Sequence, residues 1–353
     1  MILGLAPMDG FTDCAFRQIT KEIFEKYGEK EKYDFRLWTE FMNADGYMIN
    51  PTGVIRHLLT SKKQAPVVAQ IFGGNEDMLL KCFADIQNKY AEIFSGIELN
   101  MGCPARNVMS TGGGSALLRC RPQTVDTIRK ISGIMKMPFS VKTRTGLDEQ
   151  DLEEQTIFLT EISKYLTAIT VHGRTVKQGY ADNGNWEFIY ALKKKVDKNC
   201  KVIGNGGIKS YEDIATYSQG DGVVLDGVLI GQAAIGNPWV FTPHIPSRQE
   251  IKETILRHLE YMMTYEIFFQ EQVKLFDGTL SMPTALLLDK PIVQSFDRSH
   301  VLISEFRKHL FQYVKGIPES KEFKQKVSTI SEYGLLVEEI QNFFTIPTES
   351  HGS

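Results

Sequence analysis

The chain has few cysteines for its length, and they are not arranged as ligand or disulfide pairs. Five cysteines are scattered over 353 residues, at positions 14, 82, 103, 120 and 200. Their number is odd and no C-x-x-C pair occurs, which argues against a disulfide framework and against a structural zinc site. The sequence therefore predicts a protein of a reducing compartment, the cytoplasm, with no resident metal.

Long apolar runs and a strong net charge are missing as well. No apolar segment approaches the ~20 residues that cross a bilayer, and the apolar start meets Asp9 too early for a signal peptide. The formal net charge is −3, so a polyanionic partner would need a local basic face and not a basic chain. These absences predict a soluble protein with no membrane partner.

The chain does contain a regular alternation of short apolar strands and amphipathic segments of helical length. The predicted strands are 2–6, 35–41, 66–72, 96–101, 138–143, 168–172, 201–204 and 222–225. The clearer helical segments between them are 12–25, 76–90, 122–134, 152–164, 186–196 and 211–218. This order predicts an α/β protein of the (β/α)₈ TIM-barrel class, whose usual size is ~250 residues. A doubly wound sheet is the alternative, but no G-x-G-x-x-G pattern follows the first strand.

Polar or reactive residues end nearly every predicted strand. They are Pro7 with Met8, Glu40, Gln70, Asn100 with Cys103, Lys142 with Arg144, His172 with Arg174, and Asn205. The carboxyl ends of barrel strands meet at one mouth, where barrel enzymes carry their sites, so a single pocket would explain all of these positions. The alternative, that each residue merely leaves a buried strand, weakens as such positions accumulate.

Cys103 is the candidate reactive residue of this mouth. It follows a buried strand, between Gly102, which permits a tight turn, and Pro104, which fixes the exit direction. Taken alone, a free cysteine is more often a small buried hydrophobe than a catalyst. Two glycine-rich turns, 204–207 and 227–231, follow the last strands, where barrels commonly bind phosphate through backbone N–H groups. A phosphate-bearing cofactor in the mouth is the resulting hypothesis.

Helical periodicity replaces the strands after residue 242. The segments 249–269, 298–314 and 322–343 predict an all-helical domain over 243–353, after a barrel domain over 1–242. Cations and two histidines gather there: Arg298, His300, Arg307, Lys308, His309, Lys315, Lys321, Lys324 and Lys326. Such a run is either a solvated helix face or a binding surface for the phosphates of a nucleic acid, and the sequence leaves both open.

Several motifs, in constant order from residue 5 to about residue 330, resemble the tRNA-dihydrouridine synthase family. They include LAPMDGFTD at 5–13, NMGCP at 100–104, VKTR at 141–144, VHGRT at 171–175, GNGGI at 204–208 and FRKHL at 306–310. The resemblance implies a barrel that holds FMN and a helical domain that binds tRNA. It also implies reduction of specific uridines to 5,6-dihydrouridine. In that reaction, reduced FMN gives a hydride to uracil C6, Cys103 gives a proton to C5, and NADPH regenerates the reduced flavin.

Carried over by position, the resemblance assigns the site residues. Cys103 is the catalytic acid. The FMN contacts are Pro7, Met8, Gln70, Lys142, His172, Asn205, Gly206, Gly207, Gly231 and Gln232, and the substrate contacts are Asn100, Arg144, Arg174, Arg307 and Lys308. Gln232 departs from the family, which generally has arginine at this position, and so removes one cation from the expected phosphate cradle.

Two other functions stay open at this point. One is an FMN oxidoreductase acting on a free pyrimidine, similar to dihydroorotate dehydrogenase, which would leave the helical tail without a role. The other is a catalytically silent RNA-binding protein. A monomer is sufficient for each of them, and no short motif identifies the uridine, the RNA or the preferred nicotinamide.

Overall fold

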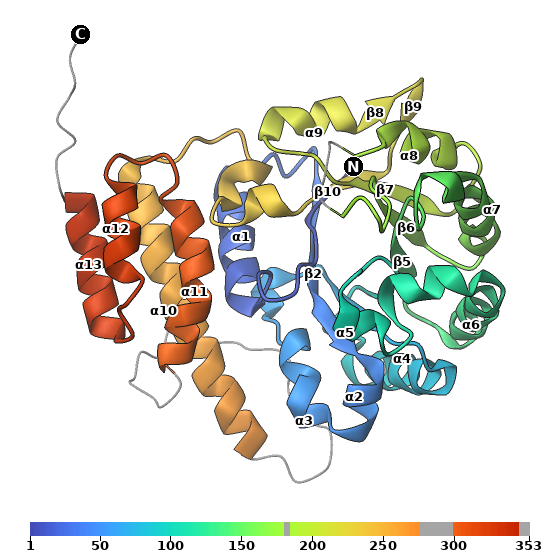
Figure 1. Ribbon diagram of the computed structural model, residues 1–353, viewed down its shortest axis with the longest axis horizontal. Helices are drawn as coiled ribbons and strands as arrows, with labels where there is room; N and C mark the ends of the chain where they lie inside the picture. Colours follow the sequence, from blue (N-terminus) through green and yellow to red (C-terminus); the bar gives the residue numbers. More distant parts are fainter. Residues whose placement is uncertain (180–183, 275–298, 346–353) are drawn as a thin grey trace.

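The computed structural model describes residues 1–179, 184–274 and 299–345, and it contains a closed parallel barrel followed by helices (Figure 1). The barrel strands are β1 (Ile2–Leu5), β2 (Asp34–Asn43), β3 (Val67–Phe72), β4 (Gly96–Asn100), β5 (Phe139–Arg144), β6 (Ala168–His172), β7 (Lys201–Asn205) and β10 (Gly227–Ile230). Neighbouring strands pair in parallel, and β1 closes the ring by pairing with both β2 and β10. The predicted TIM barrel is confirmed.

The prediction of the last barrel strand is wrong. The pattern places it at 222–225 and assigns 227–231 to a turn, whereas the barrel strand is β10 (Gly227–Ile230). Residues 219–224 instead form a small antiparallel hairpin of β8 (Gln219–Gly220) and β9 (Val223–Val224). Gly227 serves close strand packing, because a Cβ there would lie 2.6 Å from the Ile2 Cβ. A glycine within an apolar run thus marked a crowded strand and not a turn.

Helices cover the outside of the barrel, as Figure 1 shows. The longer ones are α1 (Cys14–Tyr27), α4 (Glu76–Tyr90), α6 (Arg121–Ile134), α7 (Leu152–Ser163), α8 (Trp186–Lys193) and α9 (Tyr211–Tyr217). Shorter ones are α2 (Ala44–Ile49), α3 (Pro51–Val54) and α5 (Arg106–Met109). Side chains cap several N-termini: Asp13 accepts from the Phe16 N–H on α1, and Asn75 accepts from the Met78 N–H on α4.

The inner face of the barrel changes character along its axis. A small apolar cluster of Ile2, Ala6, Trp38, Val68, Ile203 and Leu229 is separate from the main core between strands and helices. Side chains two residues apart on a strand share a face. Gln70 therefore follows Val68 on the inner face, and Asn205 follows Ile203. On β3 and β7 the inner face therefore passes from an apolar to a polar side chain toward the carboxyl end, where barrel enzymes place their sites.

Four helices follow the barrel: α10 (Arg248–Lys274), α11 (Ser299–Tyr313), α12 (Ser320–Val327) and α13 (Tyr333–Thr345). The single helix predicted over 322–343 is wrong, since residues 328–332 separate α12 from α13. This break contains two serines and a threonine, whose side chains compete for backbone hydrogen bonds. Arg298, the first cation of the predicted basic stretch, lies outside the described residues. Within the part of the chain that is described, no helix is both long enough and apolar enough to span a membrane.

Helix α1 belongs to both parts of the molecule. Its residues Phe16 and Phe24 pack in the barrel core, whereas Cys14, Ala15, Ile19 and Ile23 belong to the core of the C-terminal helices. Because this second core includes a barrel helix, the division into domains 1–242 and 243–353 stays a prediction.

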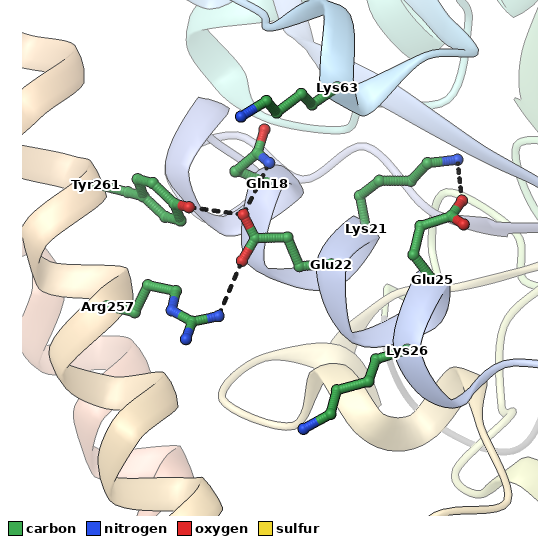
Figure 2. A pocket seen from close by; sticks show the side chains of 8 residues that line it. All are labelled: Gln18, Lys21, Glu22, Glu25, Lys26, Lys63, Arg257 and Tyr261. Atoms are coloured by element: carbon green, nitrogen blue, oxygen red, sulfur yellow. Dashed lines mark hydrogen bonds and ion pairs between the residues drawn. The ribbon is translucent and has the colours of Figure 1, made fainter. Parts of the chain in front are cut away.

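A polar contact lies beside this shared core, in a groove of about 520 Å³ between α1 and α10 (Figure 2). The Glu22 carboxylate accepts hydrogen bonds from the Tyr261 hydroxyl at 2.6 Å, from Gln18 Nε2 at 2.9 Å and from Arg257 Nη1 at 3.3 Å. Residues of both helices therefore meet at one carboxylate, which helps to fix α10 against the barrel.

Candidate active site at the barrel mouth

A chain of hydrogen bonds joins the inner faces of β3 and β4. Gln70 Nε2 donates to Glu98 Oε1 at 2.6 Å, and Asn100 Nδ2 donates to Gln70 Oε1 at 3.0 Å. All three side chains are buried. The structure thus brings together Gln70 and Asn100, which the resemblance assigns to different ligands, and adds a carboxylate to them.

Cys103 lies on the turn after β4, and Asn100 holds that turn. Asn100 Oδ1 accepts from the main-chain N–H groups of Gly102 and Cys103, both at 3.0 Å. The Cys103 carbonyl accepts from the Ser115 N–H at 3.0 Å. Burial is the main cause that raises the pKa of the half-buried thiol above its ordinary value. The thiol therefore keeps its proton near neutral pH, which a proton donor requires.

Lys142 connects β5 with β7 and β10. Its Nζ donates to Asn205 Oδ1 at 3.0 Å, and Asn205 Nδ2 donates to the Leu229 carbonyl at 2.9 Å. Burial lowers the pKa of Lys142 to about 8, while the negative charge of Glu98 acts in the opposite direction. The ammonium group is thus still largely charged at pH 7, and it is desolvated, which strengthens its effect on a nearby negative charge.

His172 lies beside Arg174 and the backbone of Gly206. Arg174 Nη1 is 3.1 Å from His172 Nε2. A guanidinium has no acceptor, so Nε2 must accept and the ring proton lies on Nδ1. Burial, followed by the charges of Lys142, Arg144 and Arg174, holds the pKa of His172 far below its ordinary value. The imidazole is therefore neutral. Gly206 has φ +108°, and a Cβ there would lie 2.6 Å from His172 Cδ2, so only glycine fits.

The glycines expected to hold a phosphate follow β7 and β10. Gly207 has φ +85°. Gly231 follows β10 directly and lies beside the half-buried Met8, since a Cβ at Gly231 would be 3.4 Å from the Met8 sulfur. Pro7, also half-buried, precedes Met8 at the end of β1. Gln232 is exposed and begins a short 3₁₀ helix (Gln232–Ala234).

Two of the three predicted substrate arginines, Arg144 and Arg307, are engaged with main-chain carbonyls. Arg144 is buried and donates to the carbonyls of Gly102 at 2.8 Å, Thr175 at 2.9 Å and Gly179 at 3.0 Å. Arg307 on α11 donates to Val327 at 3.2 Å and to Ile330, and so holds the break between α12 and α13. Arg144 therefore fixes the Cys103 turn and the segment after β6. Arg307 is not brought to the group of mouth side chains.

The basic stretch of the tail does not form one face. His309 is buried against the rings of Phe11, Phe16 and His258, and burial lowers its pKa to about 3. Lys326 pairs with Glu339 at 2.6 Å. Lys315 and Lys321 are exposed, and Lys324 is half-buried. The helical period turns His309 into the core, so the cations and histidines of this stretch do not share one surface.

Lys308 reaches the loop after β1. Its Nζ lies 4.7 Å from the centre of the Phe11 ring, and a Cβ at Gly10 would be 3.3 Å from this nitrogen. Glu40 Oε1 accepts from the Gly10 N–H at 2.6 Å, and Glu40 Oε2 lies 3.9 Å from His57 Nδ1. A cation from the C-terminal helices therefore stands at the edge of the mouth.

Ligand atoms of Asp9, Glu40 and His57 lie within 4.8 Å of one another, a spacing that a metal ion could use. The main-chain N–H of Gly10 already occupies one oxygen of Glu40. The sequence prediction that no metal is bound stays a prediction.

Glu98 is the residue that sequence reasoning missed. It lies in the middle of an apolar strand, two residues before Asn100, and it is fully buried. Burial raises its pKa to about 7, against the opposing charge of Lys142. An acidic residue inside an otherwise apolar barrel strand was the available signal, because buried acids are rare unless they are paired.

A parallel barrel with a cysteine, a lysine, a histidine and amide side chains at the carboxyl ends of its strands has the organisation of a barrel enzyme. The family model described as Dihydrouridine synthase (Dus) matches residues 4–346, and the chain belongs to this family. The family resemblance read from the motifs is thereby confirmed.

Two relatives extend this match. A protein of Aquifex aeolicus named "Probable tRNA-dihydrouridine synthase" is 26% identical over 324 residues, which cover 91% of this chain and 89% of that protein. A protein of Staphylococcus epidermidis with the same name is 32% identical over 272 residues, covering 74% of this chain and 78% of that protein. Among solved structures, a mandelate oxidase variant with an FMN adduct gives a TM-score of 0.38 at 15% identity, covering 65% of this chain and 64% of that one. This last similarity is too low to carry an argument.

Proposed function

We propose that the protein reduces specific uridines of tRNA to 5,6-dihydrouridine, with FMN as cofactor, NADPH as reductant and Cys103 as the proton donor. The observation that carries the proposal is the Cys103 turn. Asn100 accepts from two of its main-chain N–H groups, Arg144 donates to the Gly102 carbonyl, and burial keeps the thiol protonated. Family membership supplies the reaction class.

The residues at the mouth fit FMN in two respects. Gly206 and Gly207 have positive φ, a Cβ at Gly206 would clash with His172, and Gly231 directly follows β10. Glycine turns of this kind suit a phosphate bound by main-chain N–H groups. The amide, ammonium and imidazole groups of Gln70, Lys142, Asn205 and His172 offer donors for the polar edge of a flavin. Pro7, Met8 and Gln232 complete the set. When bound and reduced, FMN supplies the hydride for uracil C6.

The side chains of the chain itself do the remaining work. Cys103 holds a proton at Sγ and gives it to uracil C5 as negative charge develops on the ring. Lys142, desolvated and charged, stabilises negative charge at the mouth. Asn100 and Arg174 orient the uracil. Arg144 keeps the Cys103 turn in place, so its contribution passes through that turn.

The C-terminal helices would bind the tRNA backbone. Lys308 at the mouth and the exposed Lys315 and Lys321 supply cations for phosphates, and Arg307 keeps α11 and the α12–α13 break together. A stacked uridine must leave its helix to reach the mouth, at a cost of a few kcal/mol. We therefore assign catalysis to residues 1–242 and RNA binding to residues 243–353, in a cytoplasmic monomer.

The test is single-turnover reduction of unmodified tRNA by the NADPH-reduced holoenzyme. Cys103→Ala should keep the flavin absorbance and lose at least about a hundredfold in rate, the usual range for loss of a general acid. Cys120→Ala is the matched control, since Cys120 is an exposed thiol at the start of α6, and it should keep the rate within about twofold.

Three results would refute the proposal. A Cys103→Ala variant at full rate would remove the assigned acid. Turnover of free uracil or orotate without tRNA turnover would favour the free-pyrimidine oxidoreductase. A protein that binds tRNA and takes up no FMN would be the catalytically silent RNA-binding protein.

A further inference from the structure

We propose that Glu98 is a positioning residue of the barrel mouth: its carboxylate anchors the Gln70–Asn100 amide chain and thereby holds the Cys103 turn. This inference rests on the proposed function only in giving Cys103 a catalytic role. The contacts themselves do not depend on it.

Glu98 lies where a charged side chain is costly unless its oxygens are hydrogen-bonded. It is fully buried on β4, with Gln70 of β3 and Ser140 of β5 as its register partners on either side. Trp38 of the small apolar cluster in the lumen faces the same carboxyl group, and its indole opposes the effect of burial on the Glu98 pKa. An acid in such surroundings persists only if its oxygens are used. One oxygen accepts from Gln70 at 2.6 Å, and the other faces the hydroxyls of Ser140 at 3.5 Å and Thr170 at 3.4 Å.

The direction of the chain follows from donor and acceptor inventories. Oε1 of Glu98 accepts, so Gln70 must present its Nε2 to Glu98 and its Oε1 to Asn100. Asn100 then has its Nδ2 committed, and its Oδ1 is left to accept from the N–H groups of Gly102 and Cys103. Reversing either amide would place a donor against a donor. A proton on the other oxygen of Glu98 leaves this order intact, because it would point to the hydroxyls.

A second role for Glu98, as the counter-charge of Lys142, is separable by substitution. Glu98→Gln removes the charge but can still present an amide oxygen to Gln70. Glu98→Met has a similar length and removes the acceptor altogether, so Gln70 Nε2 loses its partner and the amide chain loses its anchor on β4. If Glu98 acts on the Cys103 turn through the amide chain, only the second variant should release that turn.

The experiment measures alkylation of Cys103 by iodoacetamide, followed by mass spectrometry over a range of pH. All variants carry Cys120→Ser, since Cys120 is exposed while Cys14, Cys82 and Cys200 are buried. Glu98→Met should react roughly three- to tenfold faster near pH 7.5, with its pH profile displaced to lower pH. Release from burial lowers a thiol pKa, and each unit gives about ten times more thiolate. Glu98→Gln and the control Ser140→Ala should stay within about twofold of the parent.

A double-variant cycle separates positioning from a general loosening of the barrel. Asn100→Ala should accelerate alkylation by itself, and adding Glu98→Met should change the rate by less than about twofold, because the chain is already cut. Multiplying effects would overturn the inference, as would a folded Glu98→Met protein with the parental rate and pH profile. If Glu98→Met does not fold, Gln70→Met cuts the chain one link further along. The same acceleration is expected there, and an unchanged rate would count against the proposal.

Failure of this inference and failure of the proposed function are distinguishable, because alkylation needs neither FMN nor tRNA. If Cys103 is alkylated faster in Glu98→Met and the parent reduces no uridine, the positioning role of Glu98 is supported and the synthase activity is refuted. If Glu98→Met is alkylated at the parental rate and the parent reduces uridine normally, the synthase activity is supported and the positioning role is refuted. In an active enzyme, Glu98→Met should lower kcat and leave the KM for tRNA within about twofold.

Discussion

Arg144 offers the sharpest test of how the mouth is held together. The resemblance assigns it to the substrate, whereas the structure engages it with three carbonyls, at 2.8, 2.9 and 3.0 Å. Hydrogen bonds to a charged group contribute about 1.5–3 kcal/mol each. A lysine ammonium is a compact charge that cannot reproduce the guanidinium fork. If it keeps one of the three bonds, Arg144→Lys should lower the free energy of unfolding by about 3–6 kcal/mol.

Urea unfolding followed by tryptophan fluorescence measures this loss. With a slope of about 3 kcal/mol per molar, at the upper end of the range for small proteins, the midpoint should fall by about 1–2 M. Arg119→Lys is the control, because Arg119 is exposed on the segment after the Cys103 turn, and it should shift stability by less than about 0.5 kcal/mol. An Arg144→Lys protein with the parental midpoint and a raised KM for tRNA would show that Arg144 binds substrate and does not hold the turn.

Three further predictions concern the cofactor cradle, the tail and the buried histidines. Gln232→Arg adds a cation beside Gly231 and should tighten FMN binding about fivefold in a fluorescence titration, roughly the 1 kcal/mol of an exposed charge pair. Gln232→Glu should weaken FMN binding. Equal affinities in the two variants would place the phosphate elsewhere. Lys308→Ala should weaken tRNA binding and flatten its salt dependence, measured by filter binding at several salt concentrations, with Lys130→Ala on α6 as the control; identical salt slopes in the two variants would remove Lys308 from the RNA interface. Burial lowers the pKa of His309 to about 3 in the folded protein. In the unfolded chain this histidine takes up a proton below its ordinary pKa of about 6.5, whereas in the folded protein it does so only near pH 3. Its stabilising contribution is therefore complete above about pH 6.5 and declines by about 1.4 kcal/mol per pH unit as the pH falls toward 3. His309→Leu should remove this part of the slope in urea unfolding between about pH 7 and 5, and an unchanged slope would contradict the assignment. Comparing slopes also cancels the titration of Asp13, whose raised pKa lies close to this range.

The sequence alone determined the barrel and the end at which its polar strand-end residues meet. Apolar runs at strand length, separated by amphipathic segments, admit few folds, and parallel strands in that order close into a barrel. Because all strands point the same way, residues that end them in the sequence must meet at one mouth. Gln70, Asn100, Lys142 and Asn205 are therefore found together, although they come from four different strands.

Only the tertiary structure decided what each charge touches. Lys142 and Arg144 both lie at the end of β5, yet Arg144 is bound to three carbonyls and Lys142 to an amide beside a carboxylate. A sequence gives the number of donors on a side chain, but the acceptors that occupy them come from segments far away along the chain. His309 illustrates the same point, because it stands next to Lys308 in a basic run and is nonetheless buried.

The remaining differences have the same physical origin. The sequence pattern indicates a turn at Gly227. The structure places β1 beside this glycine, where Ile2 occupies the space that a Cβ would need. In the sequence, Glu98 is an isolated acid in an apolar strand. In the structure, Gln70 donates to its carboxylate and Asn100 donates to Gln70. Periodicity and residue type are local properties, so they predicted seven of the eight barrel strands and the end of the barrel where the polar side chains meet. Packing and hydrogen-bond pairing are properties of distant segments in contact, and they alone decided which residues hold the Cys103 turn.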